Sequence, residues 1–421
     1  MTTKASGITA NFSVRTFMQR IGRRAYKAMP VPDAAKIKIA HMLFLLAGPL
    51  FKGMGHYESW RGRSCFSKTQ DMTFPVDLYC AKKVMVFLVP EHNVISGGIF
   101  SMFSIANQMW RLRHVHGYEV LVMTRPNPLN VTYFRNTTFR NSDNVYRFEQ
   151  ILLCREAEDV YLHIPEYAAA TFMDDISFAE RDYLKSRKNL YTNLLNQNIK
   201  LMPEKEQFER LRRLCNDNIS QSVAHHAYFT KFIANKYQLP TLLLPAYTDL
   251  SSYSPLRFPD KDDLIIYSPD EAPYKHECLN RIAREFPHFQ LIEIQNMSFD
   301  KFMGYATRCL FSITFGEGFD GYIAQPIMQG GIGFAAYNDE FFPSPHFQKY
   351  ANIFKNGDDM VVSICDRIKR LSADRLEYET LNAALVNEYQ RLYDFETYAR
   401  QVEKLAQRQF ELFPQKVRGI A

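Results

Sequence analysis

The chain has no paired cysteines, no apolar run long enough to cross a membrane and no recognisable secretory leader. Its seven cysteines are scattered and never spaced as CxxC, so the sequence predicts neither a disulfide framework nor a zinc knuckle. The apolar stretch from Ile39 to Phe51 is interrupted by Gly48 and Pro49 and is shorter than the roughly 20 residues that span a bilayer. The basic opening region is too long for a signal peptide and no A-x-A-like cleavage site follows it, so we do not expect a secretory signal. The scattered cysteines fit a reducing cytoplasm.

The chain is rich in the residues that build a core. Of its 421 residues 46% are hydrophobic and 14% are aromatic, which is enough apolar material for more than one domain. This composition excludes a disordered protein and predicts two globular domains with an appendage.

Positive charge is concentrated at the start of the chain. Residues 1 to 40 carry eight basic side chains and one acid, Asp33, a balance of +7 within a total of +6, so the rest of the chain sums to −1. Basic groups gain on the order of 1 kcal/mol each near an anionic leaflet. Residues 1–51 are therefore expected to hold the protein peripherally on the cytoplasmic membrane, or else to pack as an ordinary helix on the next domain. No stacking motif or recognisable module accompanies the charge, so nucleic acid is not an expected partner.

Strand and helix patterns alternate in two successive series, which predicts an α/β fold with parallel sheets. We expect a basic N-terminal extension over 1–79, a first Rossmann-like domain over 80–255, and a second over 256–421 whose long helical segment, Glu377 to Phe413, returns to the first domain. In the first series, strands are expected at Lys82 to Pro90, Tyr118 to Thr124, Asp159 to Tyr167 and Thr241 to Tyr247, with helices at Ile99 to Arg113, Pro203 to Cys215 and Ser222 to Tyr237. In the second, strands are expected at Asp263 to Pro269, Phe289 to Ile294 and Cys309 to Phe315, with helices at His276 to Phe286 and Ser298 to Cys309.

The segment TFGEGFDGYIAQPIMQGG, Thr314 to Gly331, is the most informative stretch. A buried strand ends there on Glu317 within a glycine cluster, and a helix begins near Tyr322. Ligands of open α/β sheets bind at the carboxyl ends of the strands. Glu317 is placed to accept hydrogen bonds from sugar hydroxyls, and the N–H groups at the helix start favour an anion.

The order of these motifs resembles the GT-B glycosyltransferases, particularly retaining family 4 and its bacterial polysaccharide and rhamnan-type members, over Lys82 to Pro414. The matching stretches are FLVPEHNVISGGIF, SVAHHAYFTKFIANKYQLPTLLLPAYTD, IIYSPDEAPYK and GEGFDGYIAQP. Two departures stand out in the hallmark E(x)7E. Gln325 occupies the place of the second glutamate, which binds the nucleotide ribose in the family, and Asp320 replaces the usual glycine of EGFG.

The resemblance implies a donor site for a nucleoside-diphosphate sugar. Lys275 matches the family lysine that contacts the diphosphate, Gly97 and Gly98 match the glycine turn of the first domain, and Glu317 contacts donor hydroxyls. The neighbouring residues of the hallmark complete the implied donor site: Gly318, Phe319, Asp320, Gly321, Tyr322 and Gln325.

Acid and base candidates come from the end of a first-domain strand. His163 and Glu166 end the strand that is expected to face the cleft, so either could orient or deprotonate the acceptor. Glu91 and His92, which follow the first strand, are weaker candidates of the same kind.

No residue set predicts a metal or a cofactor. His225 and His226 read as helix residues without a third ligand at suitable spacing. The sequence DKDD, Asp260 to Asp263, lies before a strand in a polar linker and is expected to be solvated.

These observations predict a glycosyltransferase that extends a bacterial surface polysaccharide or lipid-linked glycan, with retention and without metal. Two alternatives stay open: a nucleotide-sugar epimerase, which needs an acid and a base beside one sugar, and a catalytically silent glycan-binding or scaffolding partner, which the glutamine at 325 motivates. Within the resemblance, dTDP-rhamnose is one candidate donor.

Overall fold

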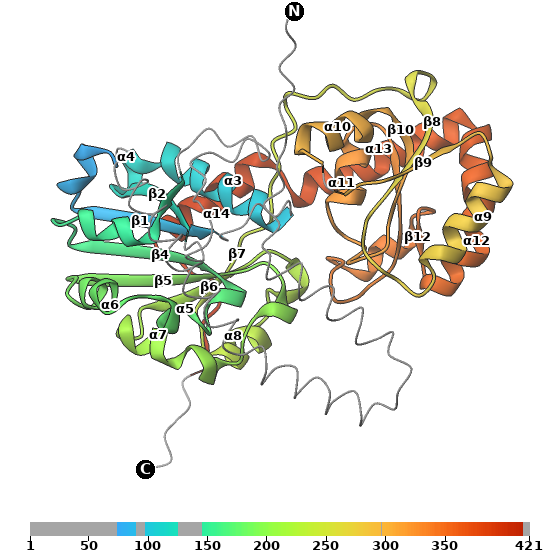
Figure 1. The fold of residues 1–421 in the computed structure, drawn as a ribbon. Helices are drawn as coiled ribbons and strands as arrows, with labels where there is room; N and C mark the ends of the chain where they lie inside the picture. Colours follow the sequence, from blue (N-terminus) through green and yellow to red (C-terminus); the bar gives the residue numbers. More distant parts are fainter. Residues whose placement is uncertain (1–73, 90–96, 125–144, 296, 416–421) are drawn as a thin grey trace, which may run out of the picture. The chain divides into compact units, whose positions relative to one another are not determined.

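The computed structural model describes residues 74–89, 97–124, 145–295 and 297–415 (Figure 1). The chain divides into two units, 1–69 and 70–421, and every described residue belongs to the second. The expectations for the basic extension and its membrane contact, and the candidates Glu91 and His92, lie outside the described residues.

The first of two sheets is seven-stranded and wholly parallel, in the order β3-β2-β1-β4-β5-β6-β7 (Figure 1). Its strands are β1 (Lys83–Val89), β2 (Glu119–Thr124), β3 (Val145–Arg147), β4 (Asp159–Pro165), β5 (Asn189–Asn196), β6 (Ile219–Val223) and β7 (Thr241–Leu243). The connections carry helices α3 (Gly97–Arg111), α4 (Arg113–His116), α5 (Phe172–Asp175), α6 (Phe178–Lys185), α7 (Glu209–Leu214) and α8 (Lys231–Tyr237).

The second sheet is five-stranded and also parallel, in the order β12-β11-β10-β8-β9. Its strands are β8 (Asp262–Tyr267), β9 (Gln290–Glu293), β10 (Cys309–Thr314), β11 (Ile332–Ala336) and β12 (Ile353–Phe354). Its helices are α9 (Lys275–Glu285), α10 (Phe299–Arg308), α11 (Gly321–Met328), α12 (Gly357–Ala373) and α13 (Arg375–Leu392). Two parallel α/β sheets confirm the predicted pair of Rossmann-like domains, the arrangement of the GT-B fold.

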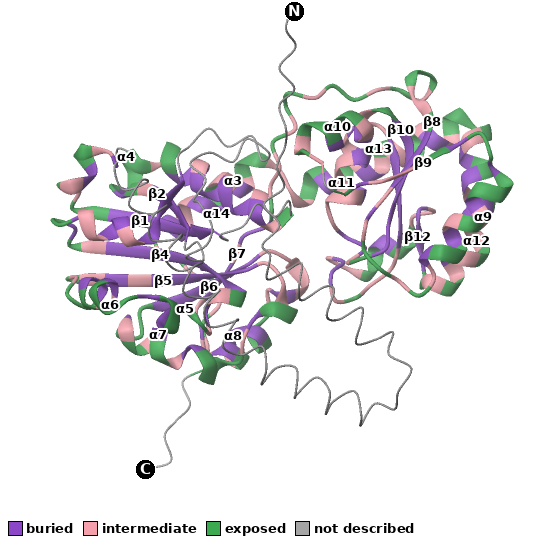
Figure 2. Cartoon of the chain, in the orientation of Figure 1, coloured by how far each residue is buried: buried purple, intermediate pink, exposed green. Residues whose placement is uncertain are grey.

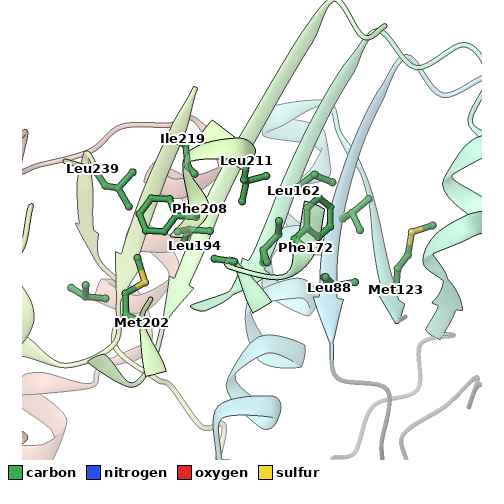
Figure 3. Packing of buried hydrophobic residues seen from close by; sticks show 14 of the residues in the cluster. Leu88, Met123, Leu162, Phe172, Leu194, Met202, Phe208, Leu211, Ile219 and Leu239 are labelled. Carbon is green, nitrogen blue, oxygen red and sulfur yellow. The ribbon is translucent and has the colours of Figure 1, made fainter. Parts of the chain in front are cut away.

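Both faces of the first sheet are covered, which explains the uninterrupted apolar run of β1. Val84, Val86 and Leu88 belong to one buried cluster, whereas Met85 and Phe87 belong to another. A strand buried on both faces needs apolar residues at every position, and β1 and β4 are buried along almost their whole length (Figure 2). Figure 3 shows part of the first cluster, in which Leu88, Met123, Leu162, Leu194 and Ile219 of five strands meet Phe172, Phe208 and Leu211.

The C-terminal segment forms two helices where the sequence predicts one. After α13, the side chain of Asp394 accepts a hydrogen bond from the backbone N–H of Thr397 and begins α14 (Phe395–Ala406). Helix α14 packs on the first sheet, where the Tyr161 hydroxyl donates to the carbonyl of Leu405 and Thr241 pairs with Leu412. In the second domain, Ser298 caps α10, since its hydroxyl accepts from the N–H of Lys301.

One predicted helix is wrong. The segment from Ser222 to Tyr237 continues β6, passes through the 3-10 turn η7 (His226–Tyr228) and only then forms α8. Strand β6 is polar in sequence, yet all its residues are buried, because neighbouring strands supply hydrogen bonds: Asn193 donates to Ser222, and Gln221 donates to Thr241. Polar side chains can be buried in a strand when they are hydrogen-bonded, so this buried strand has no apolar run in the sequence.

Among the described residues, no helix combines the length and the apolar character that a membrane crossing requires.

Candidate functional site

A cavity of about 1490 Å³ is lined by residues of both domains. From the first domain come the start of α3 and the segments that follow β4, β5 and β6; from the second come the segments that follow β8, β9 and β10. These are the carboxyl ends of parallel strands, where ligands of α/β proteins bind. The cavity is therefore the candidate functional site.

Glu317 lies in this cavity, on the turn between β10 and α11. Burial, together with the charges of Asp320 and Asp270, raises the pKa of its carboxyl to about 7 against the opposing effect of the Lys200 cation. At neutral pH, Glu317 is divided between its acid and base forms, which suits proton transfer.

Glu166 also lines the cavity, as the first residue of the 3-10 turn η4 (Glu166–Ala168) after β4. Its carboxyl is almost wholly buried, and burial raises its pKa to about 7 against the effect of backbone hydrogen bonds, including those from Gln197 and Asn198. The structure thus brings two of the predicted catalytic carboxylates to one cavity, one from each domain.

Asn198, which the sequence did not single out, contacts both carboxylates. It follows β5 and is the N-cap of the 3-10 turn η5 (Ile199–Leu201). Its backbone N–H donates to Glu166 Oε1 at 3.2 Å, and its side-chain Nδ2 donates to Glu317 Oε1 at 3.3 Å.

His225, predicted to lie in a helix, follows β6 and lines the cavity. Its Nε2 lies 3.8 Å from Glu317 Oε2. Burial lowers the pKa of the imidazole to about 4, despite a backbone hydrogen bond with Gln197. The ring is neutral near pH 7, so its contact with Glu317 is polar and not an ion pair.

The described part of the cavity wall is acidic. It carries carboxylates from both domains but no lysine or arginine among the described residues; the carboxylates are Glu166, Asp270, Glu317, Asp320 and Asp394. Neighbouring carboxylates in a shared site raise one another's pKa. The wall therefore favours hydroxyl-rich ligands and proton exchange.

Gly97 and Gly98 line the cavity at the start of α3, as predicted for the glycine turn. A Cβ atom at Gly97 would meet no atom within 4 Å, so nothing in the described residues fills the space beside it. The N–H groups of Gly97 and Gly98, at the start of a long helix, are suited to a phosphate.

The start of α11 differs from the expectation. Asp320 caps this helix: one carboxylate oxygen accepts from Tyr322 N–H at 2.8 Å, and the other accepts from the Thr314 hydroxyl at 2.6 Å. Burial raises the pKa of Asp320 to about 6, while these hydrogen bonds lower it. Because the Asp320 carboxylate already accepts hydrogen bonds at the N-terminus of α11, fewer N–H groups are left there for a ligand anion than the sequence predicts.

Of the remaining hallmark residues, four line the cavity and one shapes the turn outside it. Phe319, Gly321, Tyr322 and Gln325 line the cavity, and Phe319 also stacks on Tyr389 with ring centroids 5.1 Å apart. Gly318 is buried outside the cavity lining and shapes the turn at a φ of +82°.

His163 is not at the cavity, so its predicted position at the cleft is wrong. It lies within β4, fully buried, with its ring stacked on Phe87 at 4.3 Å. Burial lowers the pKa of the imidazole to about 3. Strand β4 continues to Pro165, two residues beyond the histidine, and this places Glu166 instead at the strand end.

Lys275 does not line the cavity either. It begins α9, its side chain is 4% exposed, and its Nζ lies 3.0 Å from Glu293 Oε1. The ammonium also lies over the ring of Tyr267, 5.6 Å from its centroid. In this structure the Lys275 ammonium pairs with Glu293, whereas the family resemblance implies that it contacts the donor diphosphate.

The missed residues share one sequence signal. Asn198 and His225 each come two residues after the end of a strand, β5 or β6, that the sequence reading did not identify. A residue that follows a parallel strand lies at the carboxyl edge of the sheet, so the strands β5 and β6, once identified, predict the position of both residues.

No protein-family model and no curated protein match the sequence. Among solved structures, the chain is similar to the MnaA–UDP co-structure from S. aureus, with 11% identity, a TM-score of 0.47, and 79% of this chain and 99% of that chain covered. It is also similar to a glycosyltransferase from Rickettsia africae ESF-5, with 9% identity, a TM-score of 0.45, and 78% and 98% covered. A ugt transferase from Siraitia grosvenorii in complex with UDP has 10% identity, a TM-score of 0.40, and 77% and 99% covered.

Proposed function

We propose that this chain is a glycosyltransferase that moves a sugar from a nucleoside-diphosphate sugar to a hydroxyl of a bacterial surface polysaccharide or lipid-linked glycan. The observation that carries the proposal is the pair of carboxylates, Glu166 and Glu317, that the strand ends of two Rossmann-like domains present to one cavity. Two such domains are suited to two substrates, because each sheet edge can bind one of them.

The reaction breaks the bond between the anomeric carbon and the diphosphate oxygen and forms a bond to the acceptor oxygen. Glu317 accepts hydrogen bonds from donor sugar hydroxyls, and Glu166 orients the acceptor hydroxyl. If the departing diphosphate takes the hydroxyl proton, attack on the same face gives retention, as the resemblance implies. If Glu166 takes the proton, in-line displacement gives inversion, and its pKa of about 7 suits that base.

The first turn of α3, with Gly97 and Gly98, is the proposed contact for the diphosphate. Its N–H groups and helix dipole favour an anion in a cavity whose other described charges are acidic. The proposal requires no resident cofactor or metal, and EDTA is expected to leave the rate unchanged.

A nucleotide-sugar epimerase is the second candidate. An epimerase removes a proton from a sugar carbon and returns one, which needs groups that are both acid and base near neutral pH. Glu166 and Glu317 have this property, and the described cavity wall has no lysine or arginine. The third reading, a silent glycan-binding protein, predicts binding without turnover.

The test begins with thermal unfolding of the full chain against UDP-, dTDP- and GDP-sugars, since a bound ligand raises the Tm. The nucleotide series that shifts the Tm, with dTDP-rhamnose included, is then incubated with glycan acceptors, and the glycoside and nucleoside diphosphate are measured. NMR of the anomeric proton assigns retention or inversion.

Glu317→Gln and Glu166→Gln are expected to lower kcat/KM by about 100-fold or more. Glu156→Gln is the matched control, because Glu156 is an exposed carboxylate paired with Lys82 and does not line the cavity. Wild-type rates in both site variants would refute the site. Solvent deuterium entering the sugar without transfer identifies an epimerase, and saturable binding without either reaction identifies a silent protein.

A further inference from the structure

The contact between Asn198 and the two carboxylates has a fixed orientation. Its Oδ1 accepts a hydrogen bond from the N–H of Lys200 at 3.0 Å, which closes the turn η5. With the oxygen occupied in this way, the amide nitrogen must face Glu317. Exchange of the two atoms would set an oxygen against a carboxylate and a donor against an N–H.

Asn198 also joins the two domains through one residue. The backbone N–H on the first-domain side donates to Glu166, while the carboxamide reaches Glu317 on the second-domain turn. Each bond donates a proton toward a carboxylate oxygen, and such bonds favour the ionised form.

We infer that Asn198 is a positioning residue that holds the carboxylates of Glu166 and Glu317 through its two hydrogen bonds and favours the ionised, hydrogen-bond-accepting form of Glu317. This inference rests on the proposed function for its kinetic consequence, but its electrostatic consequence can be measured without any reaction. A neutral amide is suited to this place because a second carboxylate would repel Glu317, and a cation would neutralise it.

Several other charged or titratable groups face Glu317 and set the background for this effect. They lie on the segments that surround the turn: Asp320 before α11, Asp270 after β8, Glu340 after β11, Lys200 in η5, and His225 and Tyr228 after β6. Three of these groups are acids whose charges raise the pKa of Glu317, and the cation of Lys200 lowers it. A hydrogen bond from Asn198 to the carboxylate acts in the same direction as Lys200. Removing the donation therefore shifts the balance toward the protonated acid.

The direct test is carboxyl-carbon NMR of protein labelled at the glutamate side chains, with Glu317→Gln identifying the resonance. Asn198→Asp keeps the acceptor for the Lys200 N–H, so the turn is preserved, but it sets a carboxylate against Glu317. The pKa of Glu317 is expected to rise by about 1 unit in Asn198→Asp and by less in Asn198→Ala, which removes the donor, together with the acceptor for the Lys200 N–H, but adds no charge.

Asn189→Asp is the matched control. Asn189 lies at the other end of β5, and its amide donates to the carboxylate of Asp159 at 2.6 Å, outside the cavity lining. The same substitution at this site is expected to leave the Glu317 titration unchanged.

In kinetics, the rising limb of the pH profile of kcat is expected to move upward by about 1 pH unit in Asn198→Asp, with about fivefold lower kcat near pH 7 and little change in the donor KM. A Glu317 titration that is unchanged in both Asn198 variants overturns the inference, even if the protein is active. A shifted titration in a protein that transfers no sugar supports the inference and refutes the proposed function instead.

Discussion

The backbone conformation of Gly318, the residue after Glu317, sets the position of the Glu317 carboxylate. Gly318 has a φ of +82°, in the left-handed region that other residues avoid, and this turn allows the chain to pass from β10 to the cap of α11 within a few residues. The carboxylate is thereby left at the cavity, while the aromatic ring of Phe319 packs below it on Tyr389.

Gly318→Ala is expected to lower the free energy of unfolding by about 1–3 kcal/mol. The new Cβ would lie 2.8 Å from the Ala336 carbonyl oxygen and 2.9 Å from a ring carbon of Phe342, in addition to the strain of the positive φ. Urea unfolding measures the change. Gly304→Ala is the control: it lies within α10 with no atom within 4 Å of the Cβ position, so it should stabilise by about 0.5–1 kcal/mol. Equal effects of the two substitutions would contradict the assignment of strain to Gly318.

Gln325 fits the same electrostatic setting. Its Nε2 lies 3.4 Å from the Thr248 hydroxyl, and its Oε1 is buried without a hydrogen-bond partner among the described residues. A glutamate here would add a further carboxylate to a cavity that already holds Glu317, Asp320 and Asp270. The neutral amide avoids that repulsion.

At the scale of elements, the strand ends decide which side chains reach the cavity. His163 lies buried within strand β4, whereas Glu166 follows the end of that strand and lines the cavity. Asn198 follows strand β5 and also lines the cavity. A shift of one residue would reverse which face each side chain occupies. The register between β4 and β5, which pairs His163 with Asn193, therefore positions the site.

The start of α9 provides a prediction about Lys275. Lys275→Met is expected to lower the free energy of unfolding by about 1–3 kcal/mol, because the carboxylate of Glu293 loses its ion-pair partner and, among the described residues, keeps only the hydrogen bond from Gln295. The affinity for a nucleotide that raises the Tm is expected to change less than twofold, as measured by isothermal titration calorimetry.

Lys349→Met serves as the control, because Lys349 is an exposed lysine in the same domain with its ammonium over the ring of Tyr350. It should change neither quantity. If Lys275→Met weakens nucleotide binding more than tenfold at unchanged stability, the lysine reaches the diphosphate, as the family resemblance implies.

At the scale of the whole molecule, the basic residues 1–51 offer a test of location that does not depend on the described structure. Deleting them is expected to lower binding to vesicles that contain anionic lipid, and added salt should weaken the binding of the full chain, since its attraction is electrostatic. Cosedimentation measures the bound fraction. Vesicles of neutral lipid are the control, and equal binding of the full and truncated chains to anionic vesicles would refute the membrane contact.

The sequence by itself determined the α/β class, most of the strands and the turn that carries Glu317. These features depend on local signals: apolar runs of strand length and glycines at a turn. It also indicated Glu166 and the glycines of α3, because the carboxyl end of a parallel strand is readable from order alone.

Only the tertiary structure decided which polar residues meet. The strands β5 and β6 are concealed in the sequence by asparagine, serine and glutamine, whose hydrogen-bond partners come from other strands. Two further contacts join residues that are far apart in the sequence: the ion pair of Lys275 with Glu293, and the hydrogen bonds of Asn198 to two carboxylates. Asp320 caps α11, which the sequence pattern also did not indicate. A hydrogen bond or ion pair depends on separations of a few ångström in space, and sequence distance does not encode those separations.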